Sequence, residues 1–278
     1  MKKTYVIIGL GLIGGSLAAA ISRRIPNARV VAFSRHGRKI KFAKKKKFID
    51  EGFTQLKAAV SSADFIFVCT PVDTIPRMVS EIDRYAKVGA IVTDVGSTKS
   101  QIVNSIGRKK LKRVKFVGSH PLAGSHLTGV THAQPNLFER AVVFVTPSQK
   151  TSSRAAREIS GVWRKLGTRV HQLSPERHDQ LVSEISHLPH AVAAALMNAV
   201  SASSLPFAAS GFLDTTRVAQ GDLNLWVPIF LTNKKNLIKN LKTLGDTLTK
   251  LARLIRNDRE QALAQFLQKA SSKRSKLA

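Results

Sequence analysis

Three groups of polar residues in this chain have the types that acid–base and anion-binding chemistry require. They are Asp94-Val95-Gly96-Ser97-Thr98-Lys99, then Gly118-Ser119-His120-Pro121-Leu122-Ala123-Gly124, and, in the second half, Ser186-His187-Leu188-Pro189-His190 with Asp214-Thr215-Thr216-Arg217. A histidine exchanges a proton near neutral pH, a serine hydroxyl bonds to the same group, and an arginine fork binds a carboxylate. Each residue alone indicates little, because a single loop histidine is more often structural. Together, Ser97, His120 and Arg217 would form an acid–base and anion-binding set.

A glycine-rich segment near the N-terminus has the spacing of a dinucleotide-binding loop. It reads Ile7-Ile8-Gly9-Leu10-Gly11-Leu12-Ile13-Gly14, with a β-branched run before it and an Ala-rich segment after it. Gly9 would make the tight turn, Gly11 would let the backbone approach a pyrophosphate, and Gly14 would let helix and strand pack closely. The helix N-terminus adds N–H donors for the phosphates. We expect the cofactor to contact the following residues: Gly9, Gly11, Leu12, Ile13, Gly14, Thr70 and Pro71.

The end of the second expected strand indicates which dinucleotide is bound. An NAD site places Asp or Glu about 20 residues after the loop to hold the ribose 2′-hydroxyl. Here Arg29–Phe33 runs into Ser34-Arg35-His36-Gly37-Arg38-Lys39, which contains no acid. Ser34 would hydrogen-bond a 2′-phosphate and Arg35 would pair with it. The sequence therefore favours NADP, with NAD as the alternative.

Length and composition describe an ordinary globular chain. It has 278 residues, 43% hydrophobic and 22% charged, which sets aside disorder, collagen and coiled coil. The single cysteine, Cys69, excludes a disulfide framework and a Cys-based zinc site and fits a reducing cytoplasm, so we expect a cytoplasmic protein without a metal. No apolar run reaches the ~18 residues of a membrane helix. The basic and apolar N-terminus has the outline of a signal peptide, but its glycines interrupt the apolar stretch, and we interpret it as part of the fold.

The net charge of +28 is unusual and permits more than one interpretation. It suggests nucleic acid or an anionic surface, but it also suits an enzyme for anionic metabolites or a chain from a basic proteome. Four consecutive lysines, Lys44–Lys47, have no helix-turn-helix, zinc or RNP-like aromatic pattern beside them. We interpret them as a solvated face and do not expect nucleic acid or a membrane as a partner.

Strand-like and helix-like segments alternate in the first half of the chain. Strands are predicted at Tyr5–Ile8, Arg29–Phe33, Phe65–Val68, Ala90–Thr93, Lys115–Val117 and Ala141–Val145, with helices at Ser16–Arg24, Ile75–Tyr85 and Ser100–Ile106. This alternation predicts an α/β fold with a doubly wound, mostly parallel sheet, which places Ser97 and His120 at the edge where ligands bind.

The second half of the chain differs from the first in composition and in the spacing of its apolar residues. After about Ser148, apart from a short run near Thr168–Leu173, it is rich in Ala and Leu at helical spacing, and Ser174-Pro175 reads as a helix start. We predict a dinucleotide-binding domain over residues 1–149 and an all-α substrate-binding and dimerisation domain over residues 150–278. The basic end, Ser271–Ala278, is expected to fray.

With these motifs in order, the chain resembles the prephenate/arogenate dehydrogenase family of tyrosine biosynthesis. The resemblance rests on GLGLIGGS, DVGSTK, GSHPLAG, SHLPHAVA and GFLDTTRVA followed by Trp226. It implies oxidative decarboxylation of a cyclohexadienol, in which hydride passes from C4 to the nicotinamide and the ring carboxylate leaves as CO₂. It further implies that His120 bonds to the 4-hydroxyl, that Ser97 contacts His120 and this hydroxyl, and that Arg217 binds a substrate carboxylate. It places His190, His187 and Trp226 near the substrate, and it implies a homodimer formed through the helical domain.

One departure from the family bears on the substrate. Six residues after the histidine several relatives carry an acid, whereas this chain has His126. Since the ammonium of arogenate favours a nearby carboxylate, His126 favours prephenate, with arogenate as the alternative.

Two other classes of protein stay open. A β-hydroxyacid or imine reductase pairs a similar loop with a helical domain, but His120-Pro121 argues against it. A basic nucleotide- or nucleic-acid-binding protein on the same scaffold would bind DNA or RNA in a salt-sensitive way without turnover.

Overall fold

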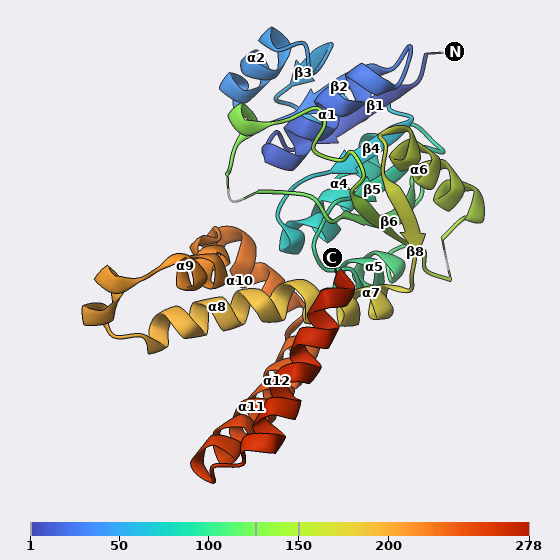
Figure 1. The fold of residues 1–278 in the computed structure, drawn as a ribbon. Coiled ribbons are helices and arrows are strands. Elements are labelled where there is room, and N and C mark those ends of the chain that lie inside the picture. Colours follow the sequence, from blue (N-terminus) through green and yellow to red (C-terminus); the bar gives the residue numbers. More distant parts are fainter. Residues whose placement is uncertain (1, 126, 150, 278) are drawn as a thin grey trace. The chain divides into compact units, whose positions relative to one another are not determined.

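The fold is built on one eight-stranded sheet (Figure 1). The computed structural model describes residues 2–125, 127–149 and 151–277. The strands, in chain order, are β1 (Thr4–Ile8), β2 (Arg29–Phe33), β3 (Glu51–Phe53), β4 (Phe65–Val68), β5 (Ile91–Asp94), β6 (Lys115–Pro121), β7 (Val142–Thr146) and β8 (Arg169–Gln172). Their order across the sheet is β3-β2-β1-β4-β5-β6-β7-β8, and only the β6–β7 pair is antiparallel. All six strands predicted from the sequence are present.

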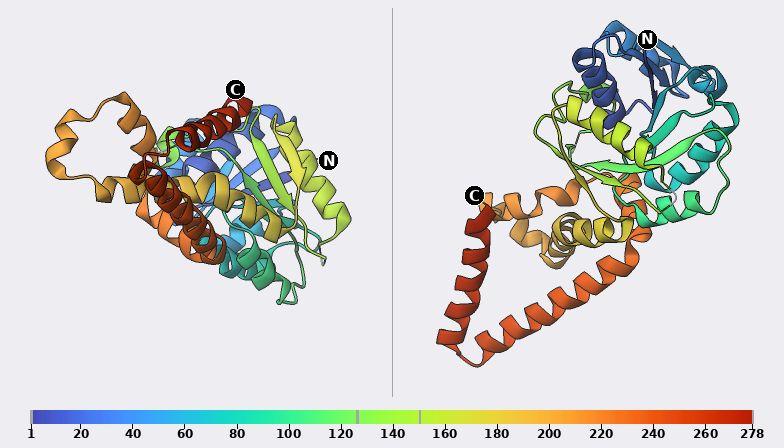
Figure 2. Two further views of the ribbon diagram at one scale, coloured as in Figure 1. Left: turned by 60° about the horizontal axis from the view of Figure 1, so that its bottom comes forward. Right: turned by 90° about the vertical axis from the view of Figure 1, so that its right-hand side faces the viewer.

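Helices cover both faces of the sheet, so the predicted doubly wound architecture is confirmed (Figure 2). They are α1 (Leu12–Arg24), α2 (Gly37–Lys45), α3 (Leu56–Val60), α4 (Ile75–Tyr85), α5 (Ser100–Gly107) and α6 (Ser153–Lys165). Along β1, Tyr5 and Ile7 pack into the core with α1, α2 and α6, whereas Val6 and Ile8 pack into the core with α3, α4 and α5. Every residue of β1 is buried because both faces are covered, which is why the strand reads as a continuous apolar run.

The strand order reverses between β1 and β4, and this creates a crevice at the carboxyl edge of the sheet. The glycine loop follows β1, and Cys69-Thr70-Pro71 follows β4. Ser97 follows β5 by three residues, and His120 lies near the end of β6. The topology therefore brings the sequence motifs of the first half to one edge.

Residues beyond 149 continue the sheet. After the 149/150 boundary predicted from the sequence, α6 packs on one face and β8 pairs in parallel with β7. Packing divides the chain at a different place, into compact units of Met1–Asn233 and Lys234–Ala278. The boundary between these compact units, after Asn233, therefore differs from the boundary at 149/150 that separates the two functional domains proposed from the sequence.

A series of helices follows the sheet within the first unit. They are α7 (Pro175–Val182), α8 (Leu188–Ala199), α9 (Ser210–Thr216) and α10 (Leu223–Thr232). The predicted helix start is confirmed, because Ser174 caps α7 and its hydroxyl accepts a hydrogen bond from the Arg177 N–H at 3.1 Å. Arg217 begins a short 3₁₀ turn, Arg217–Gln220, between α9 and α10.

A widened π-turn, Ser183–His187, joins α7 to α8. The Leu188 N–H donates to the carbonyl of Ser183, five residues earlier. Pro189 provides the physical reason, since it has no N–H and its ring clashes with the carbonyl four residues before it. Such π-turns occur often at functional sites, and this one carries His187.

The second unit is a pair of helices, α11 (Lys234–Arg256) and α12 (Glu260–Arg274), which contact each other. They are separated at Asp258, whose φ of +47° ends the helical path. The frayed end predicted from Ser271 onward is wrong as far as Arg274, since α12 continues to that residue and a 3₁₀ turn follows at Ser275–Leu277. In the described part of the chain, none of the helices is both long and apolar enough to cross a membrane.

Candidate active site

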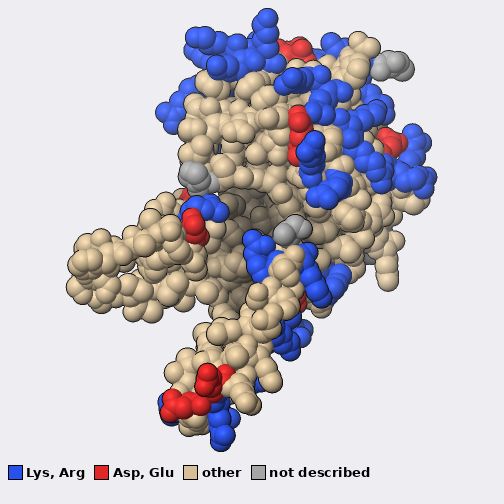
Figure 3. Space-filling view, in the orientation of Figure 1, with Lys and Arg blue, Asp and Glu red and all other residues tan. Residues whose placement is uncertain are grey.

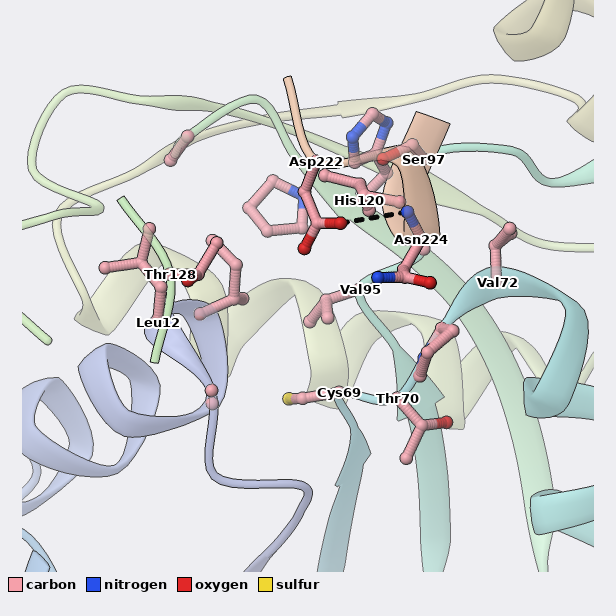
Figure 4. A pocket seen from close by; sticks show the side chains of 18 of the residues that line it. Leu12, Cys69, Thr70, Val72, Val95, Ser97, His120, Thr128, Asp222 and Asn224 are labelled. Atoms are coloured by element: carbon pink, nitrogen blue, oxygen red, sulfur yellow. Dashed lines mark hydrogen bonds between the residues drawn. The ribbon is translucent and has the colours of Figure 1, made fainter. Parts of the chain in front are cut away.

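A cavity of about 310 Å³ lies against the glycine loop. Its walls come from the start of α1, the ends of β4 and β5, His120, and the start of α10 (Figure 4). The predicted cofactor residues Gly11, Leu12, Ile13, Gly14, Thr70 and Pro71 all line it. Asp222 and Asn224 also face this cavity, with the Asn224 N–H donating to Asp222 Oδ1 at 2.9 Å (Figure 4).

The three glycines have the geometry that a dinucleotide loop needs. Gly9 has a φ of +101°, which only glycine adopts readily, and it makes the tight turn. A Cβ on Gly14 would lie 1.9 Å from the Gly9 carbonyl oxygen, so only glycine allows this approach of helix and loop. A Cβ on Gly11 would meet nothing within 4 Å. The open space at Gly11, beside the N-terminus of α1, fits a pyrophosphate.

A second cavity, of about 450 Å³, adjoins the first. Four of the residues predicted for the substrate line it: His187, His190, Arg217 and Trp226. Ser97 and His120 line both cavities. In the described structure these two side chains do not hydrogen-bond to each other. The arrangement offers a place for a dinucleotide and a place for a small anion, with His120 and Ser97 where the two meet.

His120 is the first member of a buried chain of hydrogen bonds. Its Nδ1 lies 2.9 Å from Nε2 of His178, and Nδ1 of His178 lies 2.8 Å from Oδ1 of Asp179. The same carboxylate accepts from the N–H groups of Lys99 at 2.7 Å and Ser100 at 2.9 Å. Burial opposes ionisation of Asp179, but the hydrogen bonds from His178 and these two amides outweigh it and lower the pKa of the carboxyl.

These contacts define where the protons of both histidines lie. The Asp179 carboxylate only accepts, so His178 carries its proton on Nδ1 and presents a lone pair on Nε2. His120 must then donate from Nδ1, which leaves the lone pair on its Nε2. Burial, followed by the electrostatic effects of His178 and Lys99, holds the pKa of His120 well below its ordinary value, so the ring is neutral near pH 7. His120 is thereby a ready hydrogen-bond acceptor at the junction of the cavities.

A fully buried ion pair, Asp94–Lys99, lies beneath the same edge. The Asp94 carboxylate also accepts from the Gly96 N–H at 2.9 Å and the Ser119 N–H at 3.1 Å. It therefore ties the loop that carries Ser97 to the strand that carries His120. Burial lowers the pKa of Lys99, and Asp94 opposes this effect.

The far wall of the second cavity is formed by histidine and tryptophan. The ring of His190 stacks on Trp226 with centroids 3.5 Å apart and planes 12° apart, and His187 meets Trp226 edge-on. Two buried ring nitrogens, Nε2 of His187 and Nδ1 of His190, have no hydrogen-bond partner among the described residues. Because buried polar atoms in folded proteins are nearly always paired, these nitrogens mark a place for a polar ligand.

The remaining predicted residues lie elsewhere. Ser34 and Arg35 follow β2, outside both cavities; the Ser34 hydroxyl accepts from the His36 N–H at 3.2 Å, and Arg35 is exposed. His126 lies outside the described residues. Lys44–Lys47 are exposed, which confirms the predicted solvated face, and Lys and Arg side chains gather over α2 in Figure 3.

Sequence reasoning did not identify five residues of the site: His178, Asp179, Asp222, Asn224 and Asn233. His178-Asp179 stands inside the polar run of a helix start, where such residues are ordinarily solvated. Their burial and their partners some 60 to 80 residues earlier in the chain could not be read from local pattern.

Comparison with known proteins agrees with this geometry. Residues 17–172 match the family described as prephenate dehydrogenase, nucleotide-binding domain, and residues 174–269 match prephenate dehydrogenase, dimerization domain. The chain is 34% identical to prephenate dehydrogenase of Bacillus subtilis over its full length, covering 76% of that protein. Among solved structures, prephenate dehydrogenase of Aquifex aeolicus in complex with hydroxyphenyl propionate and NAD⁺ aligns with a TM-score of 0.93 at 32% identity, covering 100% of this chain and 99% of that one. Arogenate dehydrogenase of Synechocystis aligns with a TM-score of 0.86 at 32% identity, covering 99% and 100%. The chain therefore belongs to the prephenate dehydrogenase family.

Proposed function

We propose that this protein oxidatively decarboxylates prephenate to 4-hydroxyphenylpyruvate with a nicotinamide dinucleotide as oxidant. The observation that carries the proposal is that Ser97 and His120 line both the cavity of the glycine loop and the cavity of Arg217 and the histidines. Bound dinucleotide would supply the acceptor for the hydride that leaves C4. The C1–carboxylate bond breaks, its electron pair enters the ring, and CO₂ departs as the ring becomes aromatic.

In this proposal His120 is the catalytic acceptor. Its Nε2 lone pair accepts a hydrogen bond from the 4-hydroxyl and draws electron density from the O–H bond as positive charge develops at C4. His178 and Asp179 act as positioning residues, because they hold the proton of His120 on Nδ1. Ser97 supplies a hydroxyl at the same point. Arg217 binds a substrate carboxylate, for which its planar fork is well suited.

We further propose that NADP is the preferred dinucleotide. No carboxylate occurs between Ser34 and Lys39. Arg35 is exposed, and in the described structure it makes no ion pair, so its guanidinium is available to a 2′-phosphate. Arg35→Ala should raise the KM for NADP about tenfold while leaving the KM for NAD within twofold. Lys41→Ala, an exposed cation on α2, is the matched control. Equal changes for both dinucleotides would contradict this assignment.

The choice of prephenate over arogenate rests on charge. By the family resemblance, His126 stands where several relatives carry an acid. The second cavity is lined by Arg217 and two histidines, and also by Asp222, whose carboxylate accepts a hydrogen bond from the Asn224 N–H. Arg217 and the histidines suit a substrate with two carboxylates and a keto group. The name of the Bacillus subtilis relative supports this preference, and that of the Synechocystis relative keeps arogenate as the alternative.

A homodimer is part of the same proposal. The match of residues 174–269 to a dimerization domain supports it. Large apolar side chains are also exposed on the single chain, including Leu231 on α10 and Leu248 and Ile255 on α11. Such faces are covered in oligomers. A cytoplasmic location also belongs to the proposal and rests on the lone cysteine.

The direct test is formation of reduced dinucleotide by the purified protein, with prephenate and arogenate each combined with NADP and NAD. Turnover of prephenate, fastest with NADP, is the expected result. Preference for arogenate would overturn the substrate assignment and leave the reaction class intact. A folded protein that binds dinucleotide but turns over neither substrate would overturn the proposed function.

A further inference from the structure

Asn233, the residue that follows α10, is buried beside the second cavity and contacts two residues of the site. Its Nδ2 lies 2.8 Å from the backbone carbonyl oxygen of Asp179 and 3.2 Å from Nδ1 of His187. A backbone carbonyl only accepts hydrogen bonds, so the side-chain atom facing Asp179 must be the amide nitrogen. This contact fixes the orientation of the amide, and the NH₂ group therefore also points a donor at His187.

The consequence for His187 is a single tautomer. A neutral imidazole that accepts a hydrogen bond on Nδ1 carries its proton on Nε2. His187 is neutral near pH 7, since burial lowers its pKa to about 4. The Nε2–H is buried and has no partner among the described residues, while the side chain lines the second cavity. The protein thus holds a hydrogen-bond donor ready beside the substrate space.

We propose that Asn233 is a positioning residue that holds His187 in its Nε2–H tautomer, so that His187 donates a hydrogen bond to an oxygen of the substrate. The inference rests on the proposed function. It assigns opposite roles to two histidines, because His178 leaves His120 with a lone pair on Nε2 and Asn233 gives His187 a proton there. The matching ligand group is a keto or carboxylate oxygen, which only accepts. A 2-oxo acid side chain offers acceptor oxygens on both its keto and its carboxylate carbon, whereas an ammonium group at the same place only donates.

The tautomer can be measured without turnover. We would label the full-length protein with ¹⁵N-histidine and record long-range ¹H–¹⁵N correlations of the imidazole rings at pH 7.5, assigning His187 from its absence in His187→Gln. The expected pattern is that of an Nε2-protonated neutral ring, and adding 4-hydroxyphenylpyruvate should shift its Nε2 signal. A ring protonated on Nδ1, or no shift on saturation with this 2-oxo acid, would overturn the inference.

A double-mutant cycle then tests whether Asn233 acts through His187. Asn233→Leu keeps the shape of the side chain and removes the donor, and it should raise the KM for prephenate about tenfold with kcat changed less than threefold. His187→Gln replaces the ring with an amide that needs no tautomer. In this background Asn233→Leu should change KM less than twofold. Thr232→Val, the neighbouring residue whose hydroxyl bonds to Thr98 at 3.0 Å, is the control for disturbing the end of α10.

The outcomes separate the two proposals. An equal effect of Asn233→Leu in both backgrounds, or a matching loss in the Thr232→Val control, would assign Asn233 a structural role and overturn the inference. Absence of prephenate turnover in the wild-type protein would overturn the proposed function, and the NMR result would still decide the tautomer and its response to the 2-oxo acid.

Discussion

The Nδ1 of His120 lies 2.9 Å from Nε2 of His178, although the two residues are 58 positions apart in the chain. His178 is completely buried and is bonded on its other side to Asp179. A hydrogen bond in this position selects the tautomer and the orientation of the His120 ring, which lines both cavities. The strand that carries His120 and the helix that carries His178 therefore determine the state of this ring together.

Removing this bond should slow the chemical step. His178→Leu leaves the Nδ1–H of His120 without an acceptor, and we expect kcat to fall about 30-fold while the KM for the dinucleotide stays within twofold. His178→Gln carries a carbonyl that accepts from His120 and an amide that donates to Asp179, so it should recover most of the loss. Steady-state kinetics on both variants, with thermal melting as the check on folding, measure this. Equal loss in the two variants would assign His178 to packing alone.

The pH dependence of kcat/KM should show that His120 acts in its neutral form. Burial, followed by the electrostatic effects of His178 and Lys99, places the pKa of His120 well below 6.5. The neutral ring therefore persists as the pH drops through 6.5, and activity should decline only at lower pH, when the ring takes up a proton. A pH–rate profile from 8 to 5 measures this. An acid limb centred at or above pH 6.5 would contradict the role given to the buried ring.

The local sequence pattern was sufficient to predict six strands of the sheet, because these strands are continuous runs rich in β-branched residues and bounded by polar residues. β3 was missed because Glu51-Gly52-Phe53 is three residues long and contains no β-branched residue. The break between α11 and α12 was not predicted, although the six residues from Arg256 to Gln261 are all polar; a positive φ at Asp258 ends the helix there.

The site was predictable only where its residues sit in sequence motifs. His120 and Ser97 stand at or just after strand ends, Gly11 and Gly14 at the start of α1, and Arg217 at the start of a 3₁₀ turn, and all of them line two adjoining cavities. The supporting residues were not predictable, because their roles depend on burial and long-range contacts. The hydrogen bond from the Lys99 N–H to Asp179, for example, spans 80 residues. No local periodicity records such a contact.

The glycine loop allows folding and cofactor binding to be separated. Gly14→Ala places a methyl 1.9 Å from the Gly9 carbonyl oxygen, and overpacking of this kind should cost about 1–3 kcal/mol of stability. Gly11 has a φ of −101°, which alanine tolerates, and its Cβ would enter open space. Gly11→Ala should therefore melt like the wild type yet bind dinucleotide at least tenfold more weakly.

Calorimetric titration of NADP and thermal melting distinguish these two effects. Gly161→Ala, in the interior of α6 with nothing within 4 Å of its added Cβ, is the matched control. It should bind normally and gain about 0.5–1 kcal/mol of stability, because alanine is the better helix former. Unchanged NADP affinity in Gly11→Ala would show that the pyrophosphate does not approach this backbone.

Burial of His187 should make the folded protein sensitive to mild acid. Its pKa of about 4 in the folded state lies below the ordinary value of 6.5, so the unfolded chain takes up a proton first as the pH falls. Stability is therefore unaffected above pH 6.5 and is lost progressively from pH 6.5 toward 4. At pH 5 this one residue should have removed about 2 kcal/mol relative to neutral and higher pH.

The variant His187→Gln has no such proton to bind, so its free energy of unfolding should fall less steeply between pH 6.5 and 5. Urea unfolding at a series of pH values gives the two slopes, with His132→Gln as the control for replacing an exposed histidine. Identical slopes in the wild type and His187→Gln would mean that folding does not lower the pKa of His187, and would contradict the burial effect on this ring.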